Sequence, residues 1–146
     1  EQMEQSINLR LATQEASQPQ QLFKEEWEIH WQWCKPLVEQ CLKYQEEYDI
    51  LDVEEGIATG KLMLWPYPNQ QSAVIITELV DFPQYRGMNL LFLAGDMSRC
   101  EELLEAVTTF ARIAECKKLF GGGRPGWKRY ATRHGFKNEH IISKDL

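Results

Sequence analysis

Apolar residues recur every three or four positions between Leu22 and Tyr48, a pattern that predicts amphipathic helix. Pro36 interrupts the pattern, because proline lacks a backbone donor and clashes with the preceding turn. The stretch is therefore either two helices, Leu22–Trp33 and Lys35–Glu47, or one kinked helix. Upstream, Ile7–Leu11 alternates apolar and polar residues, which predicts a short strand, and residues 13–21 read as a loop.

The middle of the chain changes to the pattern of strands. A short helix over Asp49–Lys61 ends in glycine, and three apolar, partly β-branched stretches separated by short turns follow it. These stretches are Leu62–Tyr67, Ala73–Val80 and Met88–Ala94. Because they are consecutive and closely linked, we expect them to form an antiparallel meander.

The last third predicts a crossover. A helix over Cys100–Glu115, with Ser98 and Glu101 as a capping box, leads to a strand over Lys118–Phe120. Strand, helix and strand should form a right-handed crossover with parallel strands. A helix over Pro125–His134 and a final strand over Glu139–Ser143 complete the chain.

These elements predict an α/β fold: a mixed, mostly antiparallel central sheet with helices on both faces. The length of 146 residues suits one domain, so we expect residues 1–146 to form a single domain whose first 21 residues are a partly flexible strand and loop.

The overall charge of −6 is unevenly distributed. Residues 1–116 hold 8 Lys and Arg against 20 Asp and Glu, which gives −12, whereas residues 117–146 hold 8 against 2, which gives +6. An acidic body argues against a general nucleic-acid binder. The basic end is either a local anion site or a solvated basic face. No apolar run approaches the ~20 residues of a membrane span, and Glu1–Arg10 lacks the pattern of a signal peptide, so we expect neither.

The cysteines and histidines do not predict a metal site. The four cysteines have no CxxC spacing, and we expect reduced, mostly buried thiols. Cys100, near a predicted helix start, is either a reactive thiol or a buried inert one. The three histidines are scattered and have no partner by spacing.

The stretch Leu119–Phe136, LFGGGRPGWKRYATRHGF, joins a strand end, a glycine-opened loop and a basic helix closed by Gly135. Such a junction is a common ligand site. With the preceding order of elements, this ending resembles the GNAT acetyltransferase superfamily, whose last helix closes on Gly-Phe. Three motifs also occur in a fixed order: WQWCKPLVE at Trp31–Glu39, then Leu64–Pro66, then Gly123–Trp127. This ordered set is similar to that of small GNAT-like proteins of tailed bacteriophages.

The resemblance implies acetyl-CoA as cofactor. Its pyrophosphate would meet the loop before the crossover helix, which here reads AGDMSRC over Ala94–Cys100. This loop has one glycine, and Asp96 places a negative charge where phosphates are expected, partly offset by Arg99. The residues that the resemblance assigns to cofactor binding are Leu93, Ala94, Gly95, Met97, Ser98, Arg99 and Arg124.

The resemblance also implies two catalytic roles. A tyrosine four residues before the Gly-Phe would protonate the departing thiolate, but that position holds Ala131, and Tyr130 lies one residue earlier, about 100° around the helix. Tyr130 is therefore either a shifted acid or a packing residue. Glu78 on the central strand is either the base for an acceptor amine or a surface residue.

Two functions remain. The weakened phosphate loop and Ala131 favour a GNAT-fold protein without catalysis, an interaction or virion-assembly module that binds other phage or host proteins. The alternative is an acetyl-CoA-dependent N-acetyltransferase that modifies an amine on a protein or small molecule. Either would act in the host cytoplasm or the virion, without nucleic acid or membrane, and oligomers are compatible with both.

Overall fold

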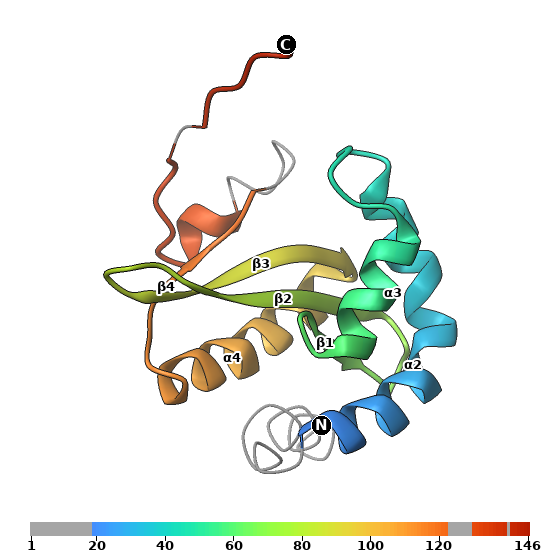
Figure 1. Cartoon of the computed structure of the whole chain (residues 1–146). Helices are drawn as coiled ribbons and strands as arrows, with labels where there is room; N and C mark the ends of the chain where they lie inside the picture. Colours follow the sequence, from blue (N-terminus) through green and yellow to red (C-terminus); the bar gives the residue numbers. More distant parts are fainter. Residues whose placement is uncertain (1–18, 123–129, 140) are drawn as a thin grey trace.

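The computed structural model describes residues 19–122, 130–139 and 141–146. Two helices come first, α2 over Pro19–Leu42 and α3 over Ile50–Thr59. The strands β1 over Met63–Tyr67, β2 over Ala73–Asp81 and β3 over Arg86–Gly95 follow. Helix α4 over Met97–Ile113 then leads to β4 over Cys116–Phe120 (Figure 1).

The four strands form one sheet in the order β1-β2-β3-β4. The first three are antiparallel neighbours, and β3 and β4 are parallel. The meander and the crossover are therefore confirmed. A register shift between Ile76 and Thr77 interrupts the pairing of β2 with β3, which restarts at Thr77 opposite Leu90.

Each face of the sheet carries its own hydrophobic core, because successive strand residues point to opposite faces. On one face, Trp65 and Ile75 pack with the apolar side of α4, including Leu103 and Val107. On the other face, neighbouring strand residues such as Leu64 and Ile76 pack against α2 and α3. The predicted mixed sheet with helices on both faces is confirmed.

Helix α2 is continuous through Pro36, so the one-helix alternative holds. The pyrrolidine ring lies exposed, while Trp31, Cys34 and Val38 on the opposite side of α2 are buried. Helix α2 begins at Pro19, inside the segment predicted as a loop. Helix α3 is bounded as expected, with a capping box between Asp49 and Asp52 and a left-handed Gly60 at its end.

The predicted strand over Glu139–Ser143 is wrong for the residues that the structure describes. Residue 139 and residues 141–143 have no regular structure and are exposed. The β-branched Ile141 and Ile142 suggested a strand, but that preference is expressed only where a residue can pair and pack. Of the last predicted helix, residues 130–133 are helical and Gly135 has a φ of +85°, as a helix-ending glycine should. The predicted first strand, Pro125 and Arg124 lie outside the described residues.

Candidate functional site

Strand β4 pairs along its length with the first four residues of β3. The pairing joins Arg86–Asn89 to Cys116–Phe120 and then stops, while β3 continues for six more residues. Gly121 marks the exit of β4, since a Cβ at this position would lie 2.7 Å from the Leu90 carbonyl oxygen. Among the described strands, none pairs with β3 on this side beyond Asn89.

The chain turns sharply from β3 into α4 at Gly95. This residue has a φ of +98°, and an added Cβ would lie 2.1 Å from the Ser72 carbonyl oxygen. Only glycine fits this position without strain. The next backbone amide, that of Asp96, donates to the same Ser72 oxygen at 2.8 Å. The loop between β1 and β2 therefore fixes where α4 begins.

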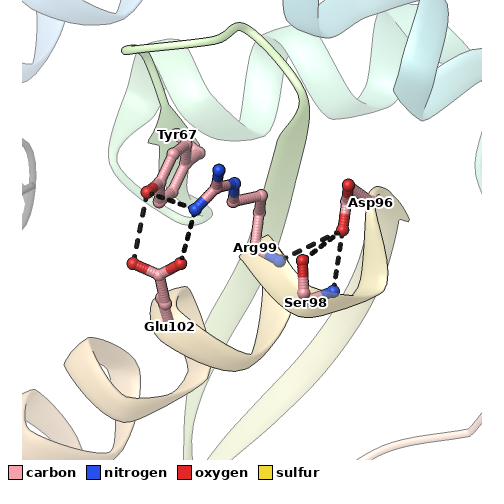
Figure 2. A network of polar contacts seen from close by, with 5 residues as sticks. All are labelled: Tyr67, Asp96, Ser98, Arg99 and Glu102. Atoms are coloured by element: carbon pink, nitrogen blue, oxygen red, sulfur yellow. Dashed lines mark hydrogen bonds and ion pairs between the residues drawn. The ribbon is translucent and has the colours of Figure 1, made fainter.

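Asp96 is the N-cap of α4, and its carboxylate covers the start of the helix (Figure 2). Oδ1 accepts hydrogen bonds from the Ser98 amide at 2.8 Å, the Ser98 hydroxyl at 2.6 Å and the Arg99 amide at 3.4 Å. The bond from the Ser98 side chain, followed by that from its backbone, holds the pKa of Asp96 below its usual range. The predicted capping box between Ser98 and Glu101 is therefore wrong, because the cap lies two residues earlier and Ser98 is its donor.

The Arg99 side chain is held by residues that the sequence did not point to. Its guanidinium donates to the Glu102 carboxylate at 3.0 Å and to the Tyr67 hydroxyl at 3.2 Å, and it lies 5.1 Å from the centre of the Tyr67 ring. Tyr67 in turn donates to Glu102 at 3.2 Å (Figure 2). The i to i+3 spacing of Arg99 and Glu102 was the one sequence signal for this network.

The remaining predicted cofactor residues of β3 and α4 are engaged in packing or exposed. Leu93 is half-buried, and its carbonyl accepts from the Cys41 thiol at 3.3 Å. Ala94 is buried, and its carbonyl lies 3.6 Å from the Cys100 sulfur. Met97 is exposed. Burial raises the pKa of Cys100 to about 12, so the inert reading of this thiol is the one that the geometry supports.

Tyr130 lies in the core on the α4 face, with 4% of its surface exposed. Its ring centre is 4.5 Å from that of His134, whose Nε2 lies 3.2 Å from a carboxylate oxygen of Glu101 on α4. Burial, and then the charge of Glu101, raises the pKa of the phenol to about 12. Tyr130 therefore keeps its proton at neutral pH, a state that suits both the packing reading and the acid reading.

Glu78 lies on the other face of the sheet. Its carboxylate accepts from the Asn89 amide group at 3.5 Å, at the last β3 residue that pairs with β4. Its charge adds to burial in raising the pKa of Tyr48, which packs with the α2 and α3 core. The two predicted catalytic residues therefore lie on opposite faces of the sheet.

Near Tyr48 the surface is hollowed into a polar pocket of about 310 Å³ that the sequence did not reveal. Its lining comes from the loop after α2, from α3 and from the residues that follow α3. The lining residues are Glu47, Tyr48, Asp52, Glu55, Gly56, Thr59, Lys61 and Leu62.

The start of α4 is where the pyrophosphate of acetyl-CoA would be expected to bind. A pyrophosphate binds a helix start through free backbone amides, yet two of these amides on α4 already bond Asp96. The carboxylate would also repel the phosphates, and Arg99 is drawn toward Glu102. The described residues at the start of α4 therefore do not fit a pyrophosphate.

The architecture nevertheless matches solved acetyltransferases. An acetyltransferase of Trypanosoma brucei superposes with a TM-score of 0.61 at 10% identity, covering 82% of this chain and 94% of that one. An aminoglycoside acetyltransferase from an uncultured soil metagenomic sample, solved with sisomicin, gives 0.58 at 10% identity and coverages of 78% and 84%. Glucosamine-6-phosphate N-acetyltransferase of Arabidopsis thaliana gives 0.51 at 11% identity, with coverages of 70% and 81%.

The chain therefore has the fold of the GNAT acyl-CoA N-acyltransferases. At identities this low, the likeness establishes the fold alone. No protein-family model and no curated protein sequence matches the chain.

Two absences concern the part of the chain that the structure describes. None of its helices is long and apolar enough to cross a membrane. Within the same residues, no cluster of three or more His, Cys, Asp or Glu side chains is arranged to hold a metal ion.

Proposed function

We propose that this chain is a GNAT-fold interaction module that does not use acetyl-CoA at the helix start where that fold receives it. The observation that carries the proposal is the Asp96 carboxylate, bonded to the amides of Ser98 and Arg99. An anion at this position must displace a carboxylate that is already hydrogen-bonded. The same charge that stabilises the helix start then opposes the phosphates.

The energetic argument favours the protein's own carboxylate. A ligand that binds loses translational and rotational freedom, which costs about 4–15 kcal/mol. Asp96 is part of the chain and caps α4 without that cost. An N-cap contributes about 0.5–2 kcal/mol to helix stability. A cofactor must therefore overcome both the lost cap and the repulsion between like charges.

The partners in this proposal are proteins. The ordered motifs at Trp31–Glu39, Leu64–Pro66 and Gly123–Trp127 support a bacteriophage setting, in which the module acts in virion assembly or against a host protein, in the host cytoplasm or the virion. The balance of −12 over residues 1–116 disfavours nucleic acid as the partner.

A second candidate is supported by a different observation. The pairing of β3 with β4 ends at Asn89, whose side chain donates to Glu78, so no described strand pairs with the rest of β3 on that side. In an acetyl-CoA-dependent N-acetyltransferase, Glu78 would accept a proton from the acceptor amine and Tyr130 would hold the proton for the leaving group. This candidate requires the cofactor to bind without the start of α4.

Thermal unfolding with and without acetyl-CoA separates the two candidates. A ligand at 100 times its dissociation constant stabilises a protein by about 2.7 kcal/mol, which moves the melting temperature by several degrees. We expect no shift for the chain at millimolar acetyl-CoA. A saturable shift would contradict the module, and loss of turnover in Tyr130→Phe with binding retained would then support the enzyme.

The positive test of the module is co-purification. The tagged chain, expressed together with candidate virion or host proteins, should retain a defined partner at a fixed stoichiometry. Recovery of the chain alone under all these conditions would contradict an interaction role.

A further inference from the structure

The loop after α2 and the first part of α3 form an acidic surface. Residues 46–55 contain six acidic residues and no basic residue, a charge of −6. The exposed ones among the six are Glu46, Glu47, Asp49, Asp52 and Glu55. Between them lies Leu51, an apolar residue of α3 that is 67% exposed. The acidic surface therefore combines negative charge with an uncovered apolar side chain.

Part of this charge is gathered around the polar pocket beside Tyr48. Three carboxylates line this pocket of about 310 Å³, those of Glu47, Asp52 and Glu55. Lys61 is the basic residue of the lining. Burial raises the pKa of the Tyr48 phenol, and neighbouring carboxylates raise it further. The pocket thus carries a net negative charge and suits a cationic side chain that can reach into it.

A basic and aromatic surface lies at the turn between β2 and β3 and on β4. Lys117 and Lys118 are exposed, and their ammonium groups lie 5.7 and 5.4 Å from the centre of the Tyr85 ring. Phe82 is 41% exposed. The centre of its ring is 5.2 Å from that of Tyr85 and 5.9 Å from that of Phe120. This basic surface therefore presents two cations beside an uncovered aromatic ring.

The neighbouring charges leave the basic surface positive. Arg86 is paired with Asp81 at 2.6 Å, and Glu115 precedes β4. With Lys117 and Lys118 the sum is three basic against two acidic residues, which gives +1. The two surfaces are therefore opposite in charge, and each carries an exposed apolar residue.

The two surfaces lie at opposite edges of the sheet. In the order β1-β2-β3-β4, the outer strands are β1 and β4. Helix α3 packs against α2 and β1, whereas the two lysines are on β4. Figure 1 shows α3 and the turn between β2 and β3 well apart on the molecule. One chain cannot bring its own two surfaces together, but two copies can.

We propose that this chain assembles head to tail, with the basic surface of one copy docked on the acidic surface of the next. Lys117 and Lys118 face the carboxylates around the pocket, and Phe82 meets Leu51. Complementary charge of this kind fixes the orientation of two partners. Because each copy uses two different surfaces, the contact is heterologous and builds a ring or a filament. The inference does not rest on the proposed function, because an enzyme or a module could assemble in this way.

Molar mass in solution is the first test. At low salt and increasing concentration, light scattering on the full chain should give a mass that passes twice the chain mass of 17.1 kDa. Raising the salt to about 1 M shortens the Debye length from about 10 Å at 0.1 M to about 3 Å, so the mass should return to that of one chain. A single chain mass throughout, a mass that stops at two chains, or an assembly indifferent to salt would overturn the proposal.

Two variants, each with one surface altered, test which surfaces meet. Glu47→Gln with Glu55→Gln neutralises part of the acidic surface, and Lys117→Gln with Lys118→Gln neutralises the basic surface. Each double variant alone should remain at the single mass where the unmodified chain assembles. Their equimolar mixture should form a complex of two chains and nothing larger, because it contains one intact surface of each kind. Neutral replacements ensure that the altered surfaces do not attract each other.

Matched controls remove one charge of each sign outside both surfaces. Glu105→Gln on α4 and Lys144→Gln near the C-terminus replace exposed residues and should assemble as the unmodified chain does. Melting temperatures equal to that of the unmodified chain verify that each variant is folded. A mixture of the two double variants that stays at the single mass, or unaltered assembly of either one alone, would show that these surfaces do not meet.

Discussion

At the scale of single residues, Trp65 and Thr77 form a polar pair inside the core on the α4 face. The indole Nε1 donates to the Thr77 hydroxyl at 2.9 Å, and both side chains are almost completely buried. A buried donor that loses its acceptor retains the full cost of desolvation. The pair therefore contributes more to the definition of the β1–β2 register than its single hydrogen bond suggests.

Replacing this acceptor tests the pair. Thr77→Val keeps the shape of the side chain but leaves the indole N–H without its acceptor, so the free energy of unfolding should fall by about 1–3 kcal/mol. Urea denaturation measures the change. Thr109→Val on the exposed side of α4 is the matched control and should change the stability by less than about 0.5 kcal/mol. Equal effects of the two substitutions would contradict the role of the pair.

Asp96 gives a second prediction at this scale. Its pKa is lower when folded than its ordinary value of 3.8, so its carboxylate stabilises the fold above that pH. The stabilisation is lost as the pH falls through the lowered pKa. Asp96→Asn keeps a capping oxygen without the charge.

The stability difference between the chain and Asp96→Asn should therefore be largest near neutral pH and vanish in strong acid. Urea denaturation from neutral to acidic pH measures it. Asp145→Asn, in the exposed C-terminal segment, is the control and should follow the unmodified chain. A difference that does not change with pH would show that the charge has no part in the cap.

At the scale of elements, two glycines with positive φ distinguish two costs of adding a side chain: backbone strain and collision with neighbouring atoms. Gly60 ends α3 with a φ of +81° and open space around it, whereas Gly95 joins β3 to α4 with a φ of +98° beside the Ser72 carbonyl. A side chain at either position meets backbone strain, but only at Gly95 does it also meet backbone atoms.

Gly60→Ala should therefore lower the free energy of unfolding by about 1 kcal/mol, the lower end of the range for a strained φ. Gly95→Ala should cost clearly more, because its Cβ collides with the loop between β1 and β2. Comparison of the two midpoints in urea tests the claim. Equal losses would mean that this loop does not fix the start of α4.

Most helices and strands could be predicted from the sequence, but two features could not. Apolar stretches separated by short turns predicted the meander, and the order of strand, helix and strand predicted the crossover. For α3, the glycine at position 60 marked where the helix ends. The cap of α4 was misplaced, since both Asp96 and Ser98 are good capping residues and only the position of the Ser72 carbonyl decides between them. The segment 141–143 has the residues of a strand, but strand formation depends on a partner that local sequence does not specify.

At the scale of the whole molecule, the fold matches that of acetyltransferases, but the start of α4 does not fit the pyrophosphate of their cofactor. The sheet and the helices on its two faces have the fold of the GNAT acyl-CoA N-acyltransferases. At the start of α4, the Asp96 carboxylate accepts hydrogen bonds from the backbone amides of Ser98 and Arg99. The network of Tyr67, Arg99 and Glu102 was beyond sequence reasoning, because its members lie on β1 and α4 and meet only through the fold.

Calorimetric titration with CoA tests the central claim most directly. If Asp96 occupies the anion position at α4, the chain should show no saturable heat at CoA concentrations below about 1 mM, which corresponds to binding weaker than about 4.1 kcal/mol. Asp96→Asn, which removes the charge but keeps the cap, should bind CoA more tightly than the chain itself. Saturable micromolar binding by the chain, unchanged in Asp96→Asn, would contradict the account.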